Sequence, residues 1–124
     1  MEFAKEFSAF LYEKKIIRFG DFTLASGKKS PYYIDLRLVP SFPIQYRKMI
    51  KGLQNLIAED IGFENFHSLV SVPTGGLVVA ASLATEILKP LIYVRDKPKE
   101  HGTGKAVEGV ICHDMKLLMI EDVV

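Results

Sequence analysis

The segment L-V-S-V-P-T-G-G-L-V-V-A-A-S-L-A-T-E-I-L-K-P-L-I-Y-V, residues 69–94, decides the fold of this 124-residue chain. Its pattern predicts a strand over 69–72, a turn over 73–76, a helix over 77–88 and a second strand over 91–94. A later apolar run predicts another strand over 117–120. Strands that alternate with helices in this way are typical of α/β proteins. We therefore expect an α/β fold with a mostly parallel sheet and flanking helices.

The first half of the chain predicts three elements before this sheet begins. Apolar residues spaced by three and four predict a helix over 2–15, and a second stripe predicts a helix over 44–61. Between them, two strand-like runs flank the turn residues 26–30, which indicates a β-hairpin. We expect a single domain over 1–124, with a hood of helix and hairpin over about 1–40 and an α/β core over about 41–124.

Composition excludes several classes of protein. Sixteen Lys and Arg against fifteen Asp and Glu give a net charge of +1, which is too balanced for general binding to nucleic acid. The most apolar run, 77–84, is far shorter than the ~20 residues of a membrane span. The single cysteine cannot form a disulfide within the chain, and the N-terminus lacks the order of a signal peptide. We expect a cytoplasmic protein.

An acidic pair, Glu121 and Asp122, directly follows the last apolar strand. At the carboxyl edge of a parallel sheet these carboxylates would face the crevice in which α/β proteins bind ligands, where they could accept hydrogen bonds from a sugar. A solvated strand end is an equally good interpretation of the pair.

Two glycine-containing segments could handle anions. In the turn 72–76, V-P-T-G-G, adjacent glycines and free amides at a helix start would suit pyrophosphate, although a plain strand-to-helix connection has the same composition. The polar loop 95–105 carries four cations and one histidine, which would suit a segment that closes over a departing polyphosphate. Such charge runs are also common on surfaces.

Lys28 and Lys29 lie near Tyr32 and Tyr33 in the sequence. A flat base could stack there beside positive charge, or the rings could simply be core residues.

Four segments together resemble the orotate phosphoribosyltransferases in order and spacing: F-G-D-F-T-L-A-S-G-K-K-S-P-Y-Y-I-D-L-R at 19–37, V-P-T-G-G at 72–76, K-E-H-G at 99–102 and I-E-D-V-V at 120–124. The resemblance implies the type I phosphoribosyltransferase fold. It also implies transfer of ribose 5-phosphate from 5-phosphoribosyl 1-diphosphate to N1 of orotate, giving orotidine 5'-monophosphate and diphosphate in pyrimidine synthesis. Mg²⁺ would arrive with the donor rather than on a site of protein ligands. A homodimer that shares loop 95–105 between subunits is implied as well.

The resemblance assigns roles to particular residues of this chain. Those matched to the phosphoribosyl diphosphate site are Arg95, Lys99, His101, Glu121, Asp122, Val123, Val124, Thr74, Gly75 and Lys28. Those matched to the orotate site are Tyr33, Ile34 and Ser26, and the expected catalytic residues are Lys99, His101 and Asp122.

Three departures from the family pattern leave other functions open. Ala25 and Asp96 stand where the family often has basic residues, and the sequence stops before the threonine- and glycine-rich loop that binds the 5'-phosphate. We expect the natural polypeptide to be longer and the 124-residue form to be nearly inactive. The alternatives are a phosphoribosyltransferase for another base and a non-catalytic module that binds a nucleotide or the donor.

Overall fold

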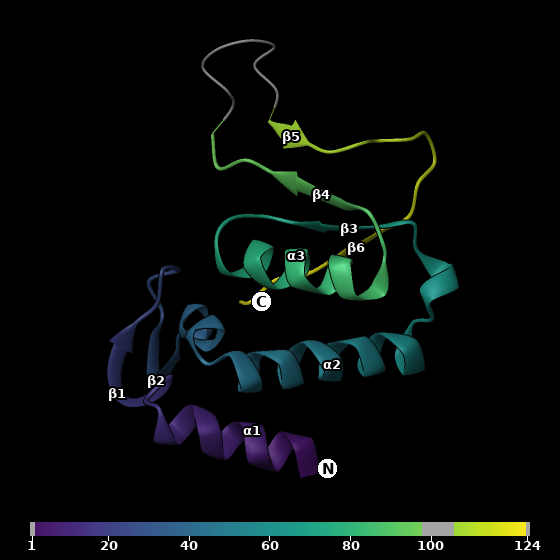
Figure 1. Ribbon diagram of the computed structural model, residues 1–124. Helices are drawn as coiled ribbons and strands as arrows, with labels where there is room; N and C mark the ends of the chain where they lie inside the picture. The colour runs from purple at the N-terminus through teal and green to yellow at the C-terminus, as the bar shows by residue number, and fades with distance from the viewer. Residues whose placement is uncertain (1, 98–105, 124) are drawn as a thin grey trace. The chain divides into compact units, whose positions relative to one another are not determined.

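The structure is a computed structural model that describes residues 2–97 and 106–123. It falls into two compact units, Met1–Met49 and Ile50–Val124. Figure 1 shows the elements along the chain. In the part described, no helix is both long enough and apolar enough to cross a membrane.

The N-terminal unit begins with α1 (Glu2–Glu13), which forms where the sequence predicts a helix. Its apolar residues recur every three or four positions, so their side chains gather on one face. The ring centroids of Phe3 and Phe7 lie 5.5 Å apart, and those of Phe7 and Phe10 lie 5.7 Å apart. Phe10 is buried and meets the ring of Phe42 edge-on at 5.3 Å. This aromatic row joins the helix to the rest of its unit.

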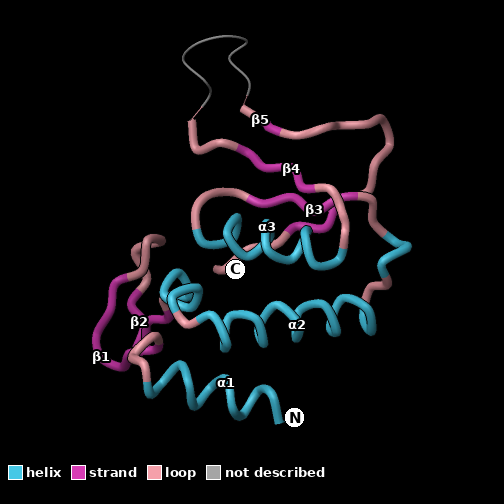
Figure 2. The backbone as a smooth tube through the Cα atoms, viewed as in Figure 1, coloured by secondary structure: helices cyan, strands magenta, loops and turns pink. Residues whose placement is uncertain are grey.

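The predicted hairpin follows as β1 (Ile17–Thr23) and β2 (Lys29–Ile34), which pair antiparallel (Figure 2). The register shifts between Phe19 and Phe22, which marks a β-bulge or similar irregularity. Gly27 has a φ of 86° in the connecting turn, a conformation that favours glycine. A short 3-10 helix, η1 (Leu36–Ser41), comes next and was not predicted.

The long helix α2 (Pro43–Asp60) begins in the first unit and ends in the second. Proline suits its first position because that backbone nitrogen needs no partner within the helix. After the helix the chain reverses at Gly62, whose φ is 88° and whose amide donates to the carbonyl of Ile57 at 2.7 Å. The prediction of a helix over 44–61 is therefore confirmed to within one residue at each end. A short 3-10 turn, η2 (Phe63–Asn65), leads into the sheet.

The second unit is built on a four-stranded sheet with the order β5-β4-β3-β6. The strands β3 (Ser68–Ser71), β4 (Leu91–Val94) and β6 (Leu117–Met119) are mutually parallel, whereas β5 (Val107–Glu108) runs antiparallel to β4. The helix α3 (Gly75–Ile87) packs against β3 and β4. Leu69, Ala80 and Leu83 have no exposed surface and form the centre of this core.

These elements confirm the predicted α/β fold with a mostly parallel sheet. The strands expected over 69–72, 91–94 and 117–120 and the helix expected over 77–88 all form, with small shifts at their ends. Among residues 2–97 and 106–123, β5 is the one strand that the sequence did not predict, and it has two residues and follows a polar segment. The division into a hood of about 1–40 and a core of about 41–124 stays a prediction.

Candidate functional site

The three parallel strands of the second unit end at the same edge of the sheet. The central strand β3 leads into the turn that holds Thr74, β4 leads into Arg95, and β6 leads into Glu121. Because ligands of open α/β sheets bind at the carboxyl ends of the strands, this edge is the candidate site. It brings together residues that lie almost fifty positions apart in the sequence.

The acidic pair is fixed by contacts around the end of β6. The amide of Ile120 donates to the carbonyl of Val70 at 3.0 Å, which continues the ladder beyond the strand. The hydroxyl of Ser71, which has no exposed surface, donates to the carbonyl of Ile120 at 2.6 Å. The backbone on both sides of Ile120 is therefore tied to β3. Glu121 leaves the sheet from a defined position.

The two carboxyl groups of this pair interact with each other. The amide of Asp122 donates to Oε1 of Glu121 at 2.9 Å. A hydrogen bond with the side chain of Asp122 favours the protonated form of Glu121 and has the largest effect on its pKa. The bond from the amide of Asp122 lowers the pKa, whereas desolvation and the charge of Asp122 raise it, so that the pKa of Glu121 is raised on balance. Such a pair gains from hydrogen-bond donors such as sugar hydroxyls, since these stabilise the ionised form.

The turn between β3 and α3 lies directly beside this acidic pair. The peptide bond between Pro73 and Thr74 is cis. Gly76, in the first turn of α3, is buried, and a Cβ built on it would lie 2.5 Å from Oε1 and 3.1 Å from Cα of Glu121. Only glycine lets the start of the helix approach β6 so closely. Helix-start amides, which bind anions readily, and carboxylates that could accept hydrogen bonds from a sugar thus share one small region.

Arg95 extends the same edge from β4. Its amide donates to the carbonyl of Ala106 at 2.7 Å, and its Nε donates to Oε1 of Glu108 at 2.8 Å. The first bond joins the two described ends of loop 95–105, for which the family resemblance implies diphosphate binding. Lys99, His101 and Val124, three of the predicted site residues, lie outside the described residues. Val123 is described and is 71% exposed.

The residues predicted to bind orotate belong to the hairpin in the first unit. The ring of Tyr33 is half-buried, with the ring of Phe22 centred 5.8 Å away and the guanidinium of Arg18 at 5.7 Å from its centroid. Ile34 pairs with Ile17 at the end of the ladder.

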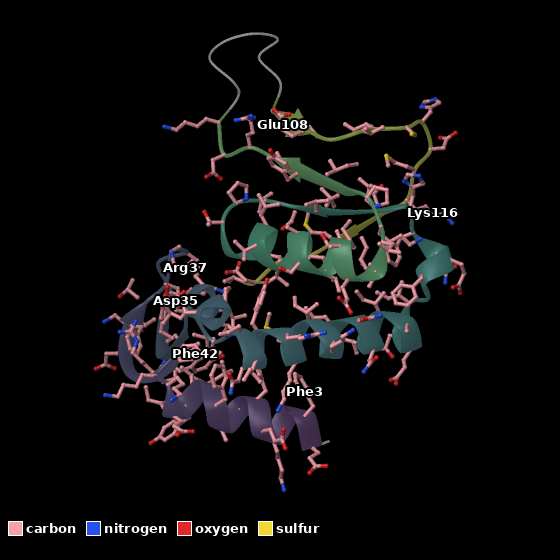
Figure 3. The ribbon with its side chains drawn as sticks, viewed as in Figure 1. Phe3, Asp35, Arg37, Phe42, Glu108 and Lys116 are labelled. Atoms are coloured by element: carbon pink, nitrogen blue, oxygen red, sulfur yellow. The ribbon has the colours of Figure 1, made fainter. Side chains whose placement is uncertain are left out.

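The turn of this hairpin holds two further predicted residues, and its base holds an ion pair. Ser26 and Lys28 are exposed in the turn, where the amide of Lys28 donates to the hydroxyl of Ser26 at 3.5 Å. At the base, Asp35 accepts hydrogen bonds from the guanidinium of Arg37 at 2.8 and 3.2 Å (Figure 3). The side-chain bond from Arg37 lowers the pKa of Asp35.

Sequence reasoning missed the contacts that hold these groups in place. Ser71 and Glu108 carried no signal, because each lies in a short run that predicts only strand or loop. Gly76 belonged to a turn that was singled out, but its approach to Glu121 depends on the sheet order and cannot be derived from local pattern. Among the described residues, no three His, Cys, Asp or Glu side chains group together in a way that could hold a metal ion.

Comparisons with known proteins find orotate phosphoribosyltransferases similar in sequence to this chain. The orotate phosphoribosyltransferase of Cenarchaeum symbiosum is 50% identical over 123 residues, which are 99% of this chain and 62% of that protein. The enzyme of Staphylothermus marinus is 40% identical over 113 residues, 91% of this chain and 53% of that protein. No protein-family model matches the chain.

Solved structures give the same result at the level of the fold. The crystal structure of orotate phosphoribosyltransferase from Aeropyrum pernix matches with a TM-score of 0.68 and 33% identity, over 90% of this chain and 61% of that one. The UMP synthase of Leishmania donovani matches with a TM-score of 0.73 and 29% identity, over 92% of this chain and 24% of that one. The chain spans about half to two thirds of the length of the curated relatives it matches. It is a homologue of the orotate phosphoribosyltransferases and has the phosphoribosyltransferase fold.

Proposed function

We propose that this protein is an orotate phosphoribosyltransferase, which transfers ribose 5-phosphate from 5-phosphoribosyl 1-diphosphate to orotate in pyrimidine synthesis. The observation that supports the proposal most is the contact between Gly76 and Glu121, because it sets a helix-start turn against an acidic pair at the carboxyl edge of the sheet. Such a site suits a ligand that carries both sugar hydroxyls and a diphosphate. The similarity to curated orotate enzymes identifies orotate as the acceptor to test first.

In this proposal the reaction depends on charge and position. The bond from C1 of the ribose to diphosphate breaks as the bond from C1 to N1 of orotate forms, and positive charge develops on the ribose. The proton on N1 is released to the departing diphosphate. Glu121 and Asp122 would accept hydrogen bonds from the ribose hydroxyls and hold the ring in line with the acceptor. Thr74, Gly75 and Arg95 would bind the leaving diphosphate. Lys28 would meet the donor, and Val123 and Val124 would continue the donor site after the acidic pair.

The remaining roles rest on the family resemblance. Lys99 and His101 are proposed to follow the diphosphate as catalytic residues, with loop 95–105 shared between the subunits of a homodimer. Ser26, Tyr33 and Ile34 are proposed to bind orotate. We also propose one phosphoribosyltransferase domain for this segment and a cytoplasmic location.

Magnesium fits the residues at the carboxyl edge. Mg²⁺ prefers oxygen ligands, keeps several waters and is usually held by one or two carboxylates together with substrate phosphates. The donor's phosphates would hold the ion, and the nearby carboxylates of Glu121 and Asp122 gain from a cation beside them, since the pKa of Glu121 is raised by its neighbour. Bound with the donor, Mg²⁺ would neutralise diphosphate charge.

The test is orotate-dependent release of diphosphate by the polypeptide that the gene encodes, with Mg²⁺ present, alongside the 124-residue chain. Changing the acidic pair in E121Q/D122N should lower kcat/KM for the donor by about 100-fold or more, because hydrogen bonds to charged groups contribute about 1.5–3 kcal/mol each. A matched control is E59Q/D60N, which neutralises another adjacent and exposed Glu-Asp pair in the same unit, at the end of α2. This control should keep the activity of the unchanged protein.

Three outcomes would contradict the proposal. Turnover with uracil, adenine or guanine in place of orotate would point to a phosphoribosyltransferase for another base. Donor binding without turnover would point to a binding module. If kcat/KM for the donor fell equally in E121Q/D122N and E59Q/D60N, the acidic pair would not be part of the site.

A further inference from the structure

Arg95 and Glu108 form an ion pair at the end of the β4–β5 ladder. The ladder pairs Tyr93 with Glu108 and Val94 with Val107, so the backbones that carry the two charged residues are held side by side. Figure 3 shows Glu108 on β5, beside the end of β4. The distance from Nε of Arg95 to Oε1 of Glu108 is 2.8 Å. The pairing of β4 with β5 therefore brings the two charged residues together.

The position of Glu108 is further fixed by the glycine that follows it. Gly109 has a φ of 126°, and a Cβ built on it would lie 3.0 Å from the carbonyl oxygen of Leu91 and 3.1 Å from Cα of Ile92. A larger residue would push the segment away from β4. Gly109 thus keeps β5, and with it Glu108, close to the strand that ends in Arg95.

In the part of the chain that the structure describes, the bond to Glu108 uses Nε of Arg95 and not its two terminal nitrogens. Within residues 2–97 and 106–123, Nε is the one nitrogen of this guanidinium that donates a hydrogen bond. The side chain of Arg95 is 35% exposed and that of Glu108 is 27% exposed. A guanidinium is planar and rigid, so a bond at Nε fixes the plane in which its two terminal nitrogens lie. Those nitrogens can then bind two oxygens of a phosphate group together.

We propose that Glu108 is a positioning residue for diphosphate, because it orients the guanidinium of Arg95 through Nε. This inference rests on the proposed function, since it takes diphosphate as the ligand of Arg95. Glu108 has two opposing effects on a bound diphosphate. Its oxygen holds Arg95 in place, which favours binding, and its negative charge opposes the anion. The two effects can be separated because glutamine keeps the oxygen and loses the charge.

The experiment is a calorimetric titration of the natural polypeptide with magnesium diphosphate. E108A removes the oxygen and should weaken binding by about 10-fold, which is the usual cost of ordering one long side chain on binding. E108Q should bind at least as tightly as the unchanged protein. In an R95A background, E108A should cause no additional loss, because Glu108 acts through Arg95. The matched control is E86A, which breaks the ion pair of Glu86 with Lys51 in the same unit and should leave the affinity unchanged.

The results that would refute the role of Glu108 differ from the result that would refute the proposed function. If the unchanged protein binds diphosphate but E108A binds equally well, or E108Q is as weak as E108A, the inference is wrong. The same holds if E108A weakens binding by the same factor in the R95A background. If the unchanged protein does not bind diphosphate at all, the proposed function itself fails. E108T, which favours a strand and cannot reach Nε, replaces E108A if alanine prevents folding.

Discussion

Replacing Gly76 by alanine should move the acidic pair away from the turn 72–76, for which we propose diphosphate binding. The new methyl group would lie 2.5 Å from Oε1 of Glu121, 3.0 Å from the hydroxyl of Ser71 and 3.1 Å from Cα of Glu121. The first contact is easily relieved, because it involves the end of an exposed side chain. The other two are not, since Ser71 is buried and bonded to Ile120, and a Cα moves only with its backbone. The start of α3 and the end of β6 must therefore separate by a few tenths of an ångström.

Two opposing effects set the change in stability. Alanine is favoured over glycine inside a helix by about 1 kcal/mol. Overpacking a well-filled site costs about 1–3 kcal/mol. We expect the second effect to exceed the first, so that G76A lowers the free energy of unfolding by about 1 kcal/mol. G76A should affect the use of the donor more than it affects stability, because a displacement approaching 1 Å in a reacting complex can cost about 100-fold in rate. We expect KM for the donor to rise by about 10-fold.

Urea unfolding and steady-state kinetics together test this expectation. A81G is the matched control, because Ala81 is exposed in the same helix and reports the helix propensity of glycine without any clash. It should lower the free energy of unfolding by about 1 kcal/mol and leave KM for the donor unchanged. If G76A were more stable than the unchanged protein by about 1 kcal/mol, with the same KM, then Gly76 would not be required for the approach of α3 to Glu121.

Two further predictions concern carboxyl groups whose pKa values are shifted. D35A removes the acceptor that bonds the amide of Arg37 at the start of η1, so it should lower stability by about 1 kcal/mol at pH 7 in urea unfolding. Because the pKa of Asp35 is lowered, this contribution is present at neutral pH and lost as the pH falls through the folded pKa, and a pH-independent difference would contradict the assignment. D122N should lower the raised pKa of Glu121 in a carboxyl NMR titration, since the neighbour that favours its protonated form is gone. Because the pKa of Glu121 is raised in the folded state, the protein loses stability as the pH rises through that pKa, and D122N should reduce this loss. An unchanged pKa of Glu121 in D122N would refute the interaction between the two carboxyl groups.

Most of the fold could be predicted from local pattern. The run from Leu69 to Val94 alternates between strand, glycine turn and helix, and apolar segments of that kind have few other ways to bury their surface. The hairpin was equally clear because turn residues separate its two strands. The sequence failed at β5 and η1. A strand of two residues has no periodicity to detect. A 3-10 helix that contains Pro40 resembles a loop between two elements, because proline usually marks such breaks.

The candidate site was predictable in its parts but not in its assembly. The acidic pair, the glycine turn and Arg95 each stand at a strand end, so a parallel sheet brings them to one edge. What local pattern could not provide is the partner of each group. Arg95 and Glu108 are thirteen positions apart, with the predicted closing loop between them, and their contact exists only because β5 pairs with β4.

The proposed function would be lost through changes at residues that bind no ligand themselves. Parallel strands bring side chains to the same edge, but a reacting complex needs them placed more finely than strand order alone achieves. In this chain the finer placement comes from Ser71, Gly76 and Glu108, which contact the candidate ligand-binding residues or their backbone. A homologue could therefore keep the acidic pair, the turn and Arg95 and still bind the donor poorly. Substitution at any of these three positions would be enough, because the ligand-binding groups would remain on the same edge but lose the contacts that orient them.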